Sequence, residues 1–482
     1  IFTGMQKLLP KNGFSQMLGR EQYATPFLPP PEEALLNYHR SRVTLSSLRT
    51  DLFQYRNSVP RPNDPLLNMA VNMTHREFSL TQPVKMIHLN DVFQLDLNIW
   101  SSSPGLPWKE LGYRTKREIR DDPDAVRRVR WFWHRIKQGE VIHAPDSCAF
   151  VRSHLVPIGE NKVRAVWGYP ATLTFGEAMF AVPLIDAYKN VFKPYLAYGF
   201  ETGTGGFRKL WRRFARHDKF YCLDFKSFDK TVPAWLINHA FDILEYNIDF
   251  VHYQDYGTAD ARKNHRMWQY IRNYFINTPI RLCNGERYRK SQGVASGSYF
   301  TQLIDSIVNS IITNYWCLRL TGSAPADYLV LGDDSIVASN CDVDLDDIDD
   351  LVQTLGMKIN LKKSMKSRSL AKCTFLGYSI GPDGIPFKDR DDLMASIYYP
   401  ERPDKTWDDV ASRALGILYA NLGWHNDVHQ FCDAIVRFKP FDLHLTRPQI
   451  KYMRFVLGLS EENIGKLPPP SQFDFTIKLH QG

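Results

Sequence analysis

Residues 329–338 read Leu-Val-Leu-Gly-Asp-Asp-Ser-Ile-Val-Ala and place two adjacent carboxylates, Asp333 and Asp334, behind Gly332. The leucine-rich and β-branched runs on either side predict a strand, a tight turn and a second strand. Strand cores are apolar, so two acids at the tip of such a hairpin need a charged partner, and a divalent cation suits them. An ordinary surface turn can also carry an Asp-Asp pair, so the rest of the chain has to test this interpretation.

A second pair of acids follows another apolar run. Residues 219–223 predict a buried strand that ends at Asp224, and Asp229 follows five residues later. If this strand neighbours the hairpin in one sheet, the carboxylates of Asp224 and Asp333 converge. Such acids can hold two Mg²⁺ ions about 4 Å apart, which activate an attacking oxygen and stabilise a leaving phosphate.

A loop of small residues, 291–297, runs into the clearest helix pattern of the chain, 299–318. Gly293 and Gly297 permit close approach of the backbone, and a helix N-terminus favours an anion or a polar ligand.

Three polar residues recur every four positions on this otherwise apolar helix, namely Thr301, Asp305 and Asn309. They form one row on one face. A buried helix tolerates such a row only when its groups have partners. The row therefore either bonds to neighbouring strands or faces a polar ligand such as a ribose.

Basic residues occur in two patterns. Lys162 and Arg164 alternate around Val163, as residues on one side of a strand do, and they suit either triphosphate oxygens or a strand edge guarded by charge. Residues 114–137 mix arginines with aromatic residues and predict either a grip on a nucleic-acid backbone or two solvated amphipathic helices broken at Pro123.

The acidic run 342–350 resembles the start of a calcium loop, but it lacks the glycine and the glutamate that such a loop needs at its sixth and twelfth positions. Its apolar spacing predicts an amphipathic helix instead, with acids at the positive end of the dipole.

Composition narrows the class of protein. A length of 482 residues exceeds the usual limit of about 250–300 residues for a single core, so several subdomains are expected. The formal net charge of +8 is compatible with a polyanionic partner. Seven scattered cysteines without a CxxC pair predict reduced thiols and support neither a zinc site nor a disulfide framework. The chain contains no run of eighteen apolar residues, so we expect no membrane span.

In this order, the motifs resemble those of viral RNA-dependent RNA polymerases. Lys162-x-Arg164, Asp224-x₄-Asp229, Ser296-Gly297-x₃-Thr301 and Gly332-Asp333-Asp334 resemble motifs F, A, B and C. Residues 102–107, 356–364 and 375–378 resemble motifs G, D and E. The wording of 293–309 is closest to polymerases of the partitiviruses, which are small double-stranded RNA viruses, with picobirnaviruses as near relatives. The resemblance covers roughly residues 102–378.

The resemblance also implies roles for single residues. Asp224 and Asp333 would bind both Mg²⁺ ions, for which Mn²⁺ is a substitute, and Asp334 would support them. Lys363, preferred over Lys362, would protonate the leaving pyrophosphate. The implied nucleotide contacts are Lys162 and Arg164 on the triphosphate, Asp229, Ser296 and Thr301 at the ribose 2′-hydroxyl, and Asp305 and Asn309 beside them. The implied contacts with template RNA are Ser102, Gly105, Arg152, Gly293 and Gly297.

One position departs from the pattern. Many positive-strand relatives carry Asn four residues after the motif B threonine, where this chain has Asp305. A carboxylate accepts a hydrogen bond but donates one only when it is protonated. The hydrogen-bond network around the sugar must therefore differ.

For the fold, the resemblance implies an α+β class, a closed right hand with fingers, a palm made of an antiparallel sheet backed by helices, and a helical thumb. The expected division is the N-terminal region and fingers at 1–170, palm at 171–243 and 285–385, a fingers insertion at 244–284, and thumb and tail at 386–482.

The implied reaction is RNA-templated attack of an RNA 3′-hydroxyl on a ribonucleoside triphosphate. The implied partners are template and product RNA, nucleotides and a capsid protein, with no membrane, in the virion interior or the host cytoplasm. A reverse transcriptase is the first alternative, but such enzymes usually place a bulky side chain where Asp229 stands. A non-catalytic RNA-binding protein associated with the capsid is the second, and the intact Asp224, Asp333 and Lys162 argue against it.

Overall fold

The two acidic segments lie on one four-stranded antiparallel sheet in the computed structural model, which describes residues 4–16, 18–19, 24–446 and 449–450. The order of its strands is β11 (Asp327–Leu331), β12 (Asp334–Ala338), β7 (Phe220–Cys222) and β13 (Met365–Ser367). The strand before Asp224 is therefore the direct neighbour of the Gly-Asp-Asp hairpin, as the sequence predicts.

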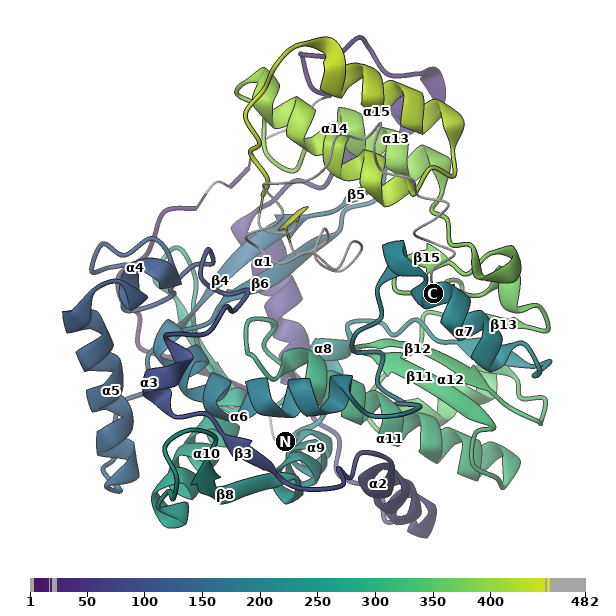
Figure 1. Ribbon diagram of the computed structural model, residues 1–482. Helices are drawn as coiled ribbons and strands as arrows, with labels where there is room; N and C mark the ends of the chain where they lie inside the picture. The colour runs from purple at the N-terminus through teal and green to yellow at the C-terminus, as the bar shows by residue number, and fades with distance from the viewer. Residues whose placement is uncertain (1–3, 17, 20–23, 447–448, 451–482) are drawn as a thin grey trace.

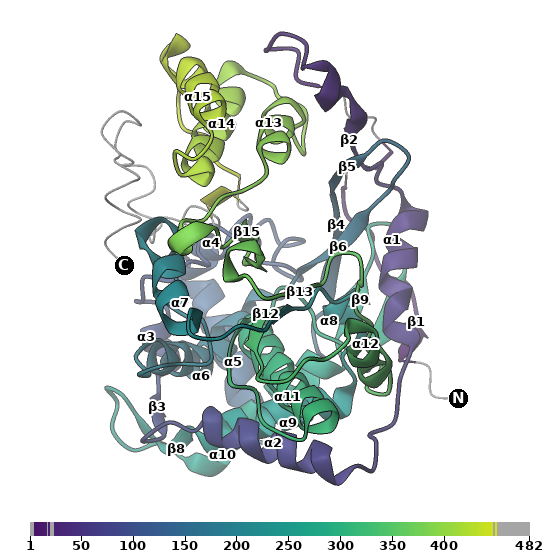
Figure 2. The same cartoon turned by 90° about the vertical axis from the view of Figure 1, so that its right-hand side faces the viewer.

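Helix α11 (Thr301–Thr321) backs this sheet and ends at Gly322, which adopts a positive φ of 74°. Its apolar residues from Leu303 to Leu318 are buried, as their helical spacing predicts. Helix α2 (Pro65–Glu77), from the N-terminal region, covers α11. Asn314 donates to the Thr74 hydroxyl over 2.9 Å, and the Tyr315 hydroxyl donates to Asp64 over 2.7 Å. Figure 2 shows α2, α9 and α11 stacked below the sheet.

A second sheet has five strands in the order β1 (Met5–Leu8), β10 (Arg287–Lys290), β9 (Pro279–Arg281), β4 (Ser147–Ser153) and β6 (Val163–Gly168). Strands β9 and β10 form an antiparallel hairpin, and β9 pairs with β4. The expected boundary between residues 284 and 285 falls inside this hairpin. The sheet continues to the end of β10, at Lys290.

Helices surround the second sheet (Figure 1). Residues 114–137 form two helices, and the second begins at Pro123, where the sequence predicts a break between two amphipathic helices. Residues 345–353 form the predicted acidic helix. The elements not yet named are α1 (Leu45–Leu52), α3 (Leu89–Val92), α4 (Lys116–Arg120), α5 (Pro123–Lys137), α6 (Ala171–Lys189), α7 (Gly206–Phe214), α8 (Phe228–Thr231), α9 (Ala234–Tyr246), α10 (Ala261–Ile276), α12 (Leu345–Gln353), β2 (Tyr38–Arg40), β3 (Val84–Met86), β5 (Leu155–Pro157), β8 (Ile248–Tyr253), β14 (Thr374–Phe375) and β15 (Tyr378–Ser379).

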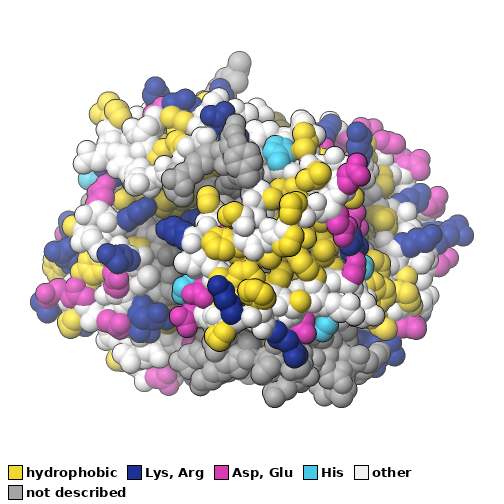
Figure 3. Space-filling view, turned by 90° about the horizontal axis from the view of Figure 1, so that it is seen from above, with side chains coloured by type: hydrophobic (Ala, Val, Ile, Leu, Met, Phe, Trp, Pro, Cys, Tyr) yellow, Lys and Arg dark blue, Asp and Glu magenta, His cyan; other side chains and the backbone are white. Residues whose placement is uncertain are grey.

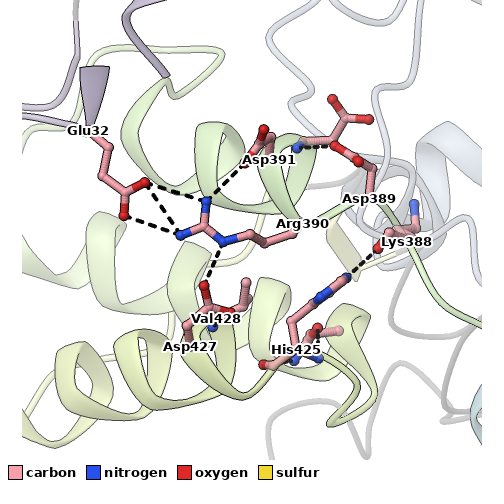
Figure 4. A network of polar contacts seen from close by, with 10 residues as sticks. Glu32, Lys388, Asp389, Arg390, Asp391, His425, Asp427 and Val428 are labelled. Atoms are coloured by element: carbon pink, nitrogen blue, oxygen red, sulfur yellow. Dashed lines mark hydrogen bonds and ion pairs between the residues drawn. The ribbon is translucent and has the colours of Figure 1, made fainter. Parts of the chain in front are cut away.

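The C-terminal part is helical, with α13 (Arg390–Tyr398), α14 (Trp407–Asn421) and α15 (Asn426–Phe438). It contacts the N-terminal region through Arg390, which lies between Glu32 and Asp427 at 3.2 and 2.5 Å (Figure 4). Arg152 reaches the same part by pairing with Glu401 at 3.1 Å. The C-terminal helices are therefore in contact with the N-terminal region and with β4, as in a closed hand.

Figure 3 views the molecule from the side of α13–α15, and hydrophobic side chains gather in the middle of this view. In the C-terminal part of the chain, the side chains of Phe438 and Trp424 are 72% and 41% exposed. All seven cysteines are free thiols. Among the described residues, every helix is too short or too polar to cross a membrane.

We expect Asp146→Ala to destabilise the five-stranded sheet strongly. The Asp146 side chain is 1% exposed and accepts hydrogen bonds from Arg281 and Arg287 at 2.9 and 2.7 Å. Removing it takes the buried carboxylate from both guanidinium groups, although Arg281 keeps its pair with Glu110 at 2.6 Å, and this loss should lower the free energy of unfolding by about 3–5 kcal/mol. Urea denaturation followed by tryptophan fluorescence measures this loss. The control is Asp124→Ala, whose exposed pair with Arg127 should contribute less than about 1 kcal/mol.

The same pair predicts a pH dependence. Burial opposes ionisation of Asp146, but hydrogen bonds from Arg287 and Arg281 outweigh it and hold the pKa below its usual value. The stabilisation is therefore complete above the unfolded pKa of about 4, and it is lost as the pH falls through the lower folded pKa. A difference between wild type and Asp146→Ala that grew on acidification would contradict this assignment.

Candidate active site

The tip of the β11–β12 hairpin carries the first two acids. Leu331 pairs with Asp334, so Gly332 and Asp333 form the turn, and Gly332 supplies the positive φ of 61° that it needs. Helix α11 braces the turn from behind. The Ser306 hydroxyl accepts from the Gly332 amide over 2.8 Å, and the Asn309 amide donates to the carbonyls of Gly332 and Asp334 over 3.2 and 3.1 Å.

Asn309, which the resemblance places beside the ribose contacts, bonds this turn through its side-chain nitrogen. Its spacing places it in the polar row, but its side-chain nitrogen is bound to the turn and its residue is buried. The first of the two interpretations of the row, bonding to a neighbouring strand, therefore holds for Asn309. Its contribution to the site is to fix the turn that carries Asp333.

Asp224 approaches these acids from the neighbouring strand. Its amide donates to the Ser364 hydroxyl over 2.9 Å, and its carbonyl accepts from the Asn360 amide over 2.7 Å, so the segment after α12 fixes its position. The charge of Asp224 raises the pKa of both Asp333 and Asp334. The three carboxylates therefore converge at one edge of the sheet.

This convergence opposes ionisation. Asp333 is accessible to water but has protein on most sides, and this crowding, with the charges of Asp229 and Asp224, raises its pKa to about 6. Burial and the charges of Asp333 and Asp224 raise the pKa of Asp334 to about 7. A cation at this edge would relieve the repulsion.

The donor chemistry of this edge fits a divalent cation, because carboxylate oxygens are the ligands that Mg²⁺ prefers. In the described part of the chain, no group of three or more His, Cys, Asp or Glu side chains is placed to hold a metal ion. Asp224, Asp333 and Asp334 therefore supply the ligand type and a shared location without a preformed shell.

Asp305 lies beside Asp229 on the face of α11 that borders the acids. It is 4% exposed, and its Oδ1 has no hydrogen-bond partner among the described residues. Burial, the charge of Asp229 and a hydrogen bond between the two carboxyls raise the pKa of Asp305 well above its usual value. This shift favours the neutral acid, which can donate a hydrogen bond as an asparagine would.

The loop before α11 is packed tightly. The Thr301 hydroxyl donates to the Ala295 carbonyl over 2.5 Å, and the Ser296 hydroxyl accepts from the Trp167 amide over 3.4 Å. A Cβ on Gly297 would lie 2.9 Å from the Trp167 carbonyl, and one on Gly293 would lie 2.4 Å from the Tyr55 ring. Both glycines are therefore needed for the close approach that the sequence predicts.

Ser102 and Gly105, from the predicted template side, reach the same region. A Cβ on Gly105 would lie 2.7 Å from the Tyr169 carbonyl, and the Ser102 hydroxyl accepts from Lys116 over 2.8 Å. The 102–105 and 293–299 loops thus pack against one short segment at the end of β6.

Positive charge faces the acids from β6. The charge of Arg164 lowers the pKa of Asp333 and Asp305. Lys162 is exposed, and the surrounding protein and the nearby charge of Lys363 lower its pKa. Lys363 therefore lies at the site, whereas Arg152 is engaged with Glu401 in the C-terminal part.

Two buried charged residues that hold the site have no signal in the sequence pattern. Lys290 is fully buried, and its ammonium donates to the carbonyls of Phe275, Ile276 and Gly293 over 2.7–2.9 Å. Glu177, in the middle of an apolar run, accepts from the Tyr299 amide over 3.0 Å. Both residues form hydrogen bonds to backbone groups, and a pattern of side chains along the sequence does not reveal such bonds.

A family model described as viral RNA-dependent RNA polymerase matches residues 23–435. The chain belongs to the viral RNA-dependent RNA polymerase family. Members of this family generally use divalent metal ions, in agreement with the acids at the sheet edge.

Three curated relatives support this assignment. The chain is 29% identical over 400 residues to the RNA-directed RNA polymerase of Cryptosporidium parvum virus 1, and the match covers 76% of this chain and 71% of the relative. Identity is 27% to the polymerase of White clover cryptic virus 1 and 26% to that of Atkinsonella hypoxylon virus, with 56% and 60% of this chain covered. The chain spans only 47% and 50% of these last two. The predicted likeness to partitivirus-like polymerases of double-stranded RNA viruses is confirmed.

Among solved structures, the Sicinivirus 3Dpol RNA-dependent RNA polymerase matches with a TM-score of 0.69 at 15% identity. The match covers 94% of this chain and 99% of that one. At this identity the likeness shows the fold, so the predicted α+β right-hand class is confirmed.

We expect Gly293→Ala to cost more stability than Gly322→Ala. Both glycines have a positive φ, of 73° and 74°, which costs an alanine roughly 1–2 kcal/mol. Gly322 has open space around it, whereas a Cβ at Gly293 meets the buried Tyr55 ring, whose hydroxyl is bound to the Val294 carbonyl. Overpacking should add about 1–3 kcal/mol. Thermal unfolding of the two variants checks this, and equal melting temperatures would show that the loop is not held against Tyr55.

Proposed function

We propose that this protein is the RNA-directed RNA polymerase of a double-stranded RNA virus. It adds ribonucleotides to an RNA 3′-hydroxyl on an RNA template. The observation that carries the proposal is the meeting of Asp224 with the Gly-Asp-Asp hairpin on adjacent strands, faced by Arg164 from β6. Acidic and basic side chains in this arrangement suit the transfer of a nucleotide from a triphosphate, with pyrophosphate as the leaving group.

Each charged residue takes a part in this proposal. Lys162 and Arg164 bind the triphosphate of the incoming nucleotide, Arg164 through its planar fork and Lys162 as a point charge. Asp224 and Asp333 hold Mg²⁺, and Asp334 supports them from the start of β12. The bound metal supplies Lewis-acid stabilisation of the charge that develops on the transferred phosphate. Lys363, beside Lys162, donates a proton to the leaving pyrophosphate.

The ribose of the incoming nucleotide binds next to these charged residues. Asp229 accepts a hydrogen bond from the ribose 2′-hydroxyl, with the Ser296 and Thr301 hydroxyls nearby. Asp305, as a neutral acid, orients Asp229 through the hydrogen bond between their carboxyls. The acid at 305 thus performs the donor role that an asparagine has in many relatives.

The two packed loops border the template. The template lies along the backbones of Ser102, Gly105, Gly293 and Gly297. Arg152 contacts the RNA close to its ion pair with Glu401. The proposed division is fingers at 1–170 and 244–290, palm at 171–243 and 291–385, and thumb from 386. The proposed partners are RNA, nucleotides and a capsid protein, in the virion interior or the host cytoplasm.

Primer extension on an RNA template tests the activity. The purified chain is given the four ribonucleotides and Mg²⁺, and in parallel the four deoxynucleotides. Extension with ribonucleotides supports the proposal, whereas preference for deoxynucleotides would indicate a reverse transcriptase. RNA binding without any extension would indicate a non-catalytic role.

We expect Asp333→Asn to abolish synthesis while the protein stays folded. The amide keeps the shape of the carboxylate but loses the charge that holds the cation, so the rate should fall by more than about a hundredfold. Single-turnover incorporation of one nucleotide measures this, with circular dichroism as the test of folding. The control is Asp346→Ala, an exposed acid on α12 that should change nothing. More than a trace of synthesis by Asp333→Asn would contradict its metal role.

We expect Asp229→Ala to lower the preference for ribose over deoxyribose. A hydrogen bond to a charged group contributes about 1.5–3 kcal/mol, so the preference should drop by about tenfold or more. Competing CTP with dCTP on one template measures the ratio. Asp305→Asn is the matched variant, and it should keep the preference because an amide can donate to Asp229 as the neutral acid does. An unchanged ratio in Asp229→Ala would remove Asp229 from the sugar site.

A further inference from the structure

Glu177 is a fully buried acid in the middle of α6, among apolar residues. Its Oε2 accepts from the Ser298 hydroxyl and its Oε1 accepts from the Tyr299 amide over 3.0 Å. The Ser298 hydroxyl in turn accepts from the Phe300 amide over 3.1 Å. One carboxyl of α6 therefore holds the three residues that lead from the small-residue loop into α11.

A carboxyl is a costly group to place there. Burial raises the pKa of Glu177 to about 8, against the opposing hydrogen bonds from Ser298 and Tyr299 and the charge of Lys116. An apolar side chain of similar size would fill the same volume without that cost. The two oxygens are used to fix the loop, so position rather than stability explains the residue.

The loop that Glu177 fixes carries proposed contacts of the active site. Ser296 and Gly297 come directly before Ser298, and Thr301 comes directly after Phe300. Gly297 packs against the Trp167 carbonyl, only four residues before α6 begins. Glu177 and the end of β6 therefore hold the loop from two sides.

The same support reaches the second loop. The Ala171 amide, at the start of α6, donates to the Pro104 carbonyl over 2.8 Å. Lys116 donates to the Ser102 hydroxyl and to the Ser103 carbonyl over 2.8 and 2.6 Å, and its charge acts on Glu177. The 102–105 and 296–299 loops are thus fixed to one buried unit, formed by residues 167–177 and Lys116.

We infer that Glu177 is a positioning residue, which sets the place of the 296–299 loop relative to the 102–105 loop. This inference rests on the proposed polymerase function, because it makes the spacing of the two loops part of nucleotide selection. Glu177 touches neither nucleotide nor metal. It acts through the Ser298 hydroxyl and the Tyr299 amide.

Three variants and a control test the inference in the full chain. Glu177→Leu removes both acceptors, Glu177→Gln keeps an acceptor for Tyr299 and a partner for Ser298, and Ser298→Ala removes one contact from the loop side. Thr174→Val is the control, because the hydroxyl of this buried threonine of α6 donates, as far as the structure describes the chain, to the Pro170 carbonyl at the start of its own helix. Hydrogen exchange of peptides covering 294–301 and the KM and kcat of single-nucleotide addition are measured for each.

We expect Glu177→Leu to speed exchange at 294–301 but not at 327–338, and to raise KM for the nucleotide by about tenfold with a smaller change in kcat. Ser298→Ala should show the same changes in weaker form, and it decides the question from the loop side if Glu177→Leu does not fold. Glu177→Gln should restore exchange and KM to within about twofold of wild type, a rescue that a merely structural cost of burial would not predict.

Exchange at 294–301 and KM in Glu177→Leu equal to those of Thr174→Val would overturn the inference. So would a KM in Glu177→Gln as high as in Glu177→Leu, because the amide keeps the geometry. A wild-type chain that extends no primer would contradict the proposed function instead. The exchange measurement needs no activity and would still decide whether Glu177 holds the loop.

Discussion

Repulsion between carboxylates at one edge of the four-stranded sheet is the constraint on which the rest of the structure depends. Asp333 and Asp334 follow each other on a tight turn, and Asp224 approaches them from the next strand. The charge of Asp224 raises the pKa of Asp333 and of Asp334, and the charge of Asp333 raises that of Asp334, so the folded chain holds together groups that would separate if they were free. The surroundings must therefore fix them, and they do so through the backbone. Asn309 and Ser306 hold the turn, and Ser364 holds the segment at Asp224.

The polar groups of α11 bond both to its neighbours and within the helix. Asn314 donates to α2, and Ser310 donates to the helix itself, at a distance from the acids. The Oδ1 atoms of Asp305, Asn309 and Asn314 lack a partner among the described residues. An unpaired buried oxygen costs free energy in the folded chain unless a proton, a water or a ligand completes it. At Asp305, beside the acids, the raised pKa favours the proton.

The sequence predicts the parts of this arrangement that depend on local pattern. The hairpin, the strand before Asp224 and the helix after Gly297 follow from apolar periodicity and turn residues, and the order of motifs identifies the family. Asn309 shows the limit, because a spacing of four places it in the polar row but does not reveal that two turn carbonyls lie behind it. The expected domain boundary near residue 284 falls inside a hairpin for a similar reason. Strand β10 pairs with β9 across Gly285, and with β1 from the far N-terminus, which no local signal indicates. Glu177 sits in an apolar run whose pattern predicts only burial.

The contacts that close the hand differ in kind from those that fix the acids. Arg390 joins Glu32 and Asp427, and Arg152 joins Glu401, through side chains that are about one third to one half exposed. Such pairs contribute about 0–1 kcal/mol each and weaken with salt. Beside them stand a few hydrogen bonds to backbone carbonyls, such as that of Arg40 to Tyr399. The loops at the active site are held by buried groups that salt does not reach. The ionic part of the contact between α13–α15 and the N-terminal region should therefore weaken with salt, whereas the buried bond of the Tyr399 hydroxyl to the Leu35 carbonyl and the geometry around Asp333 should not.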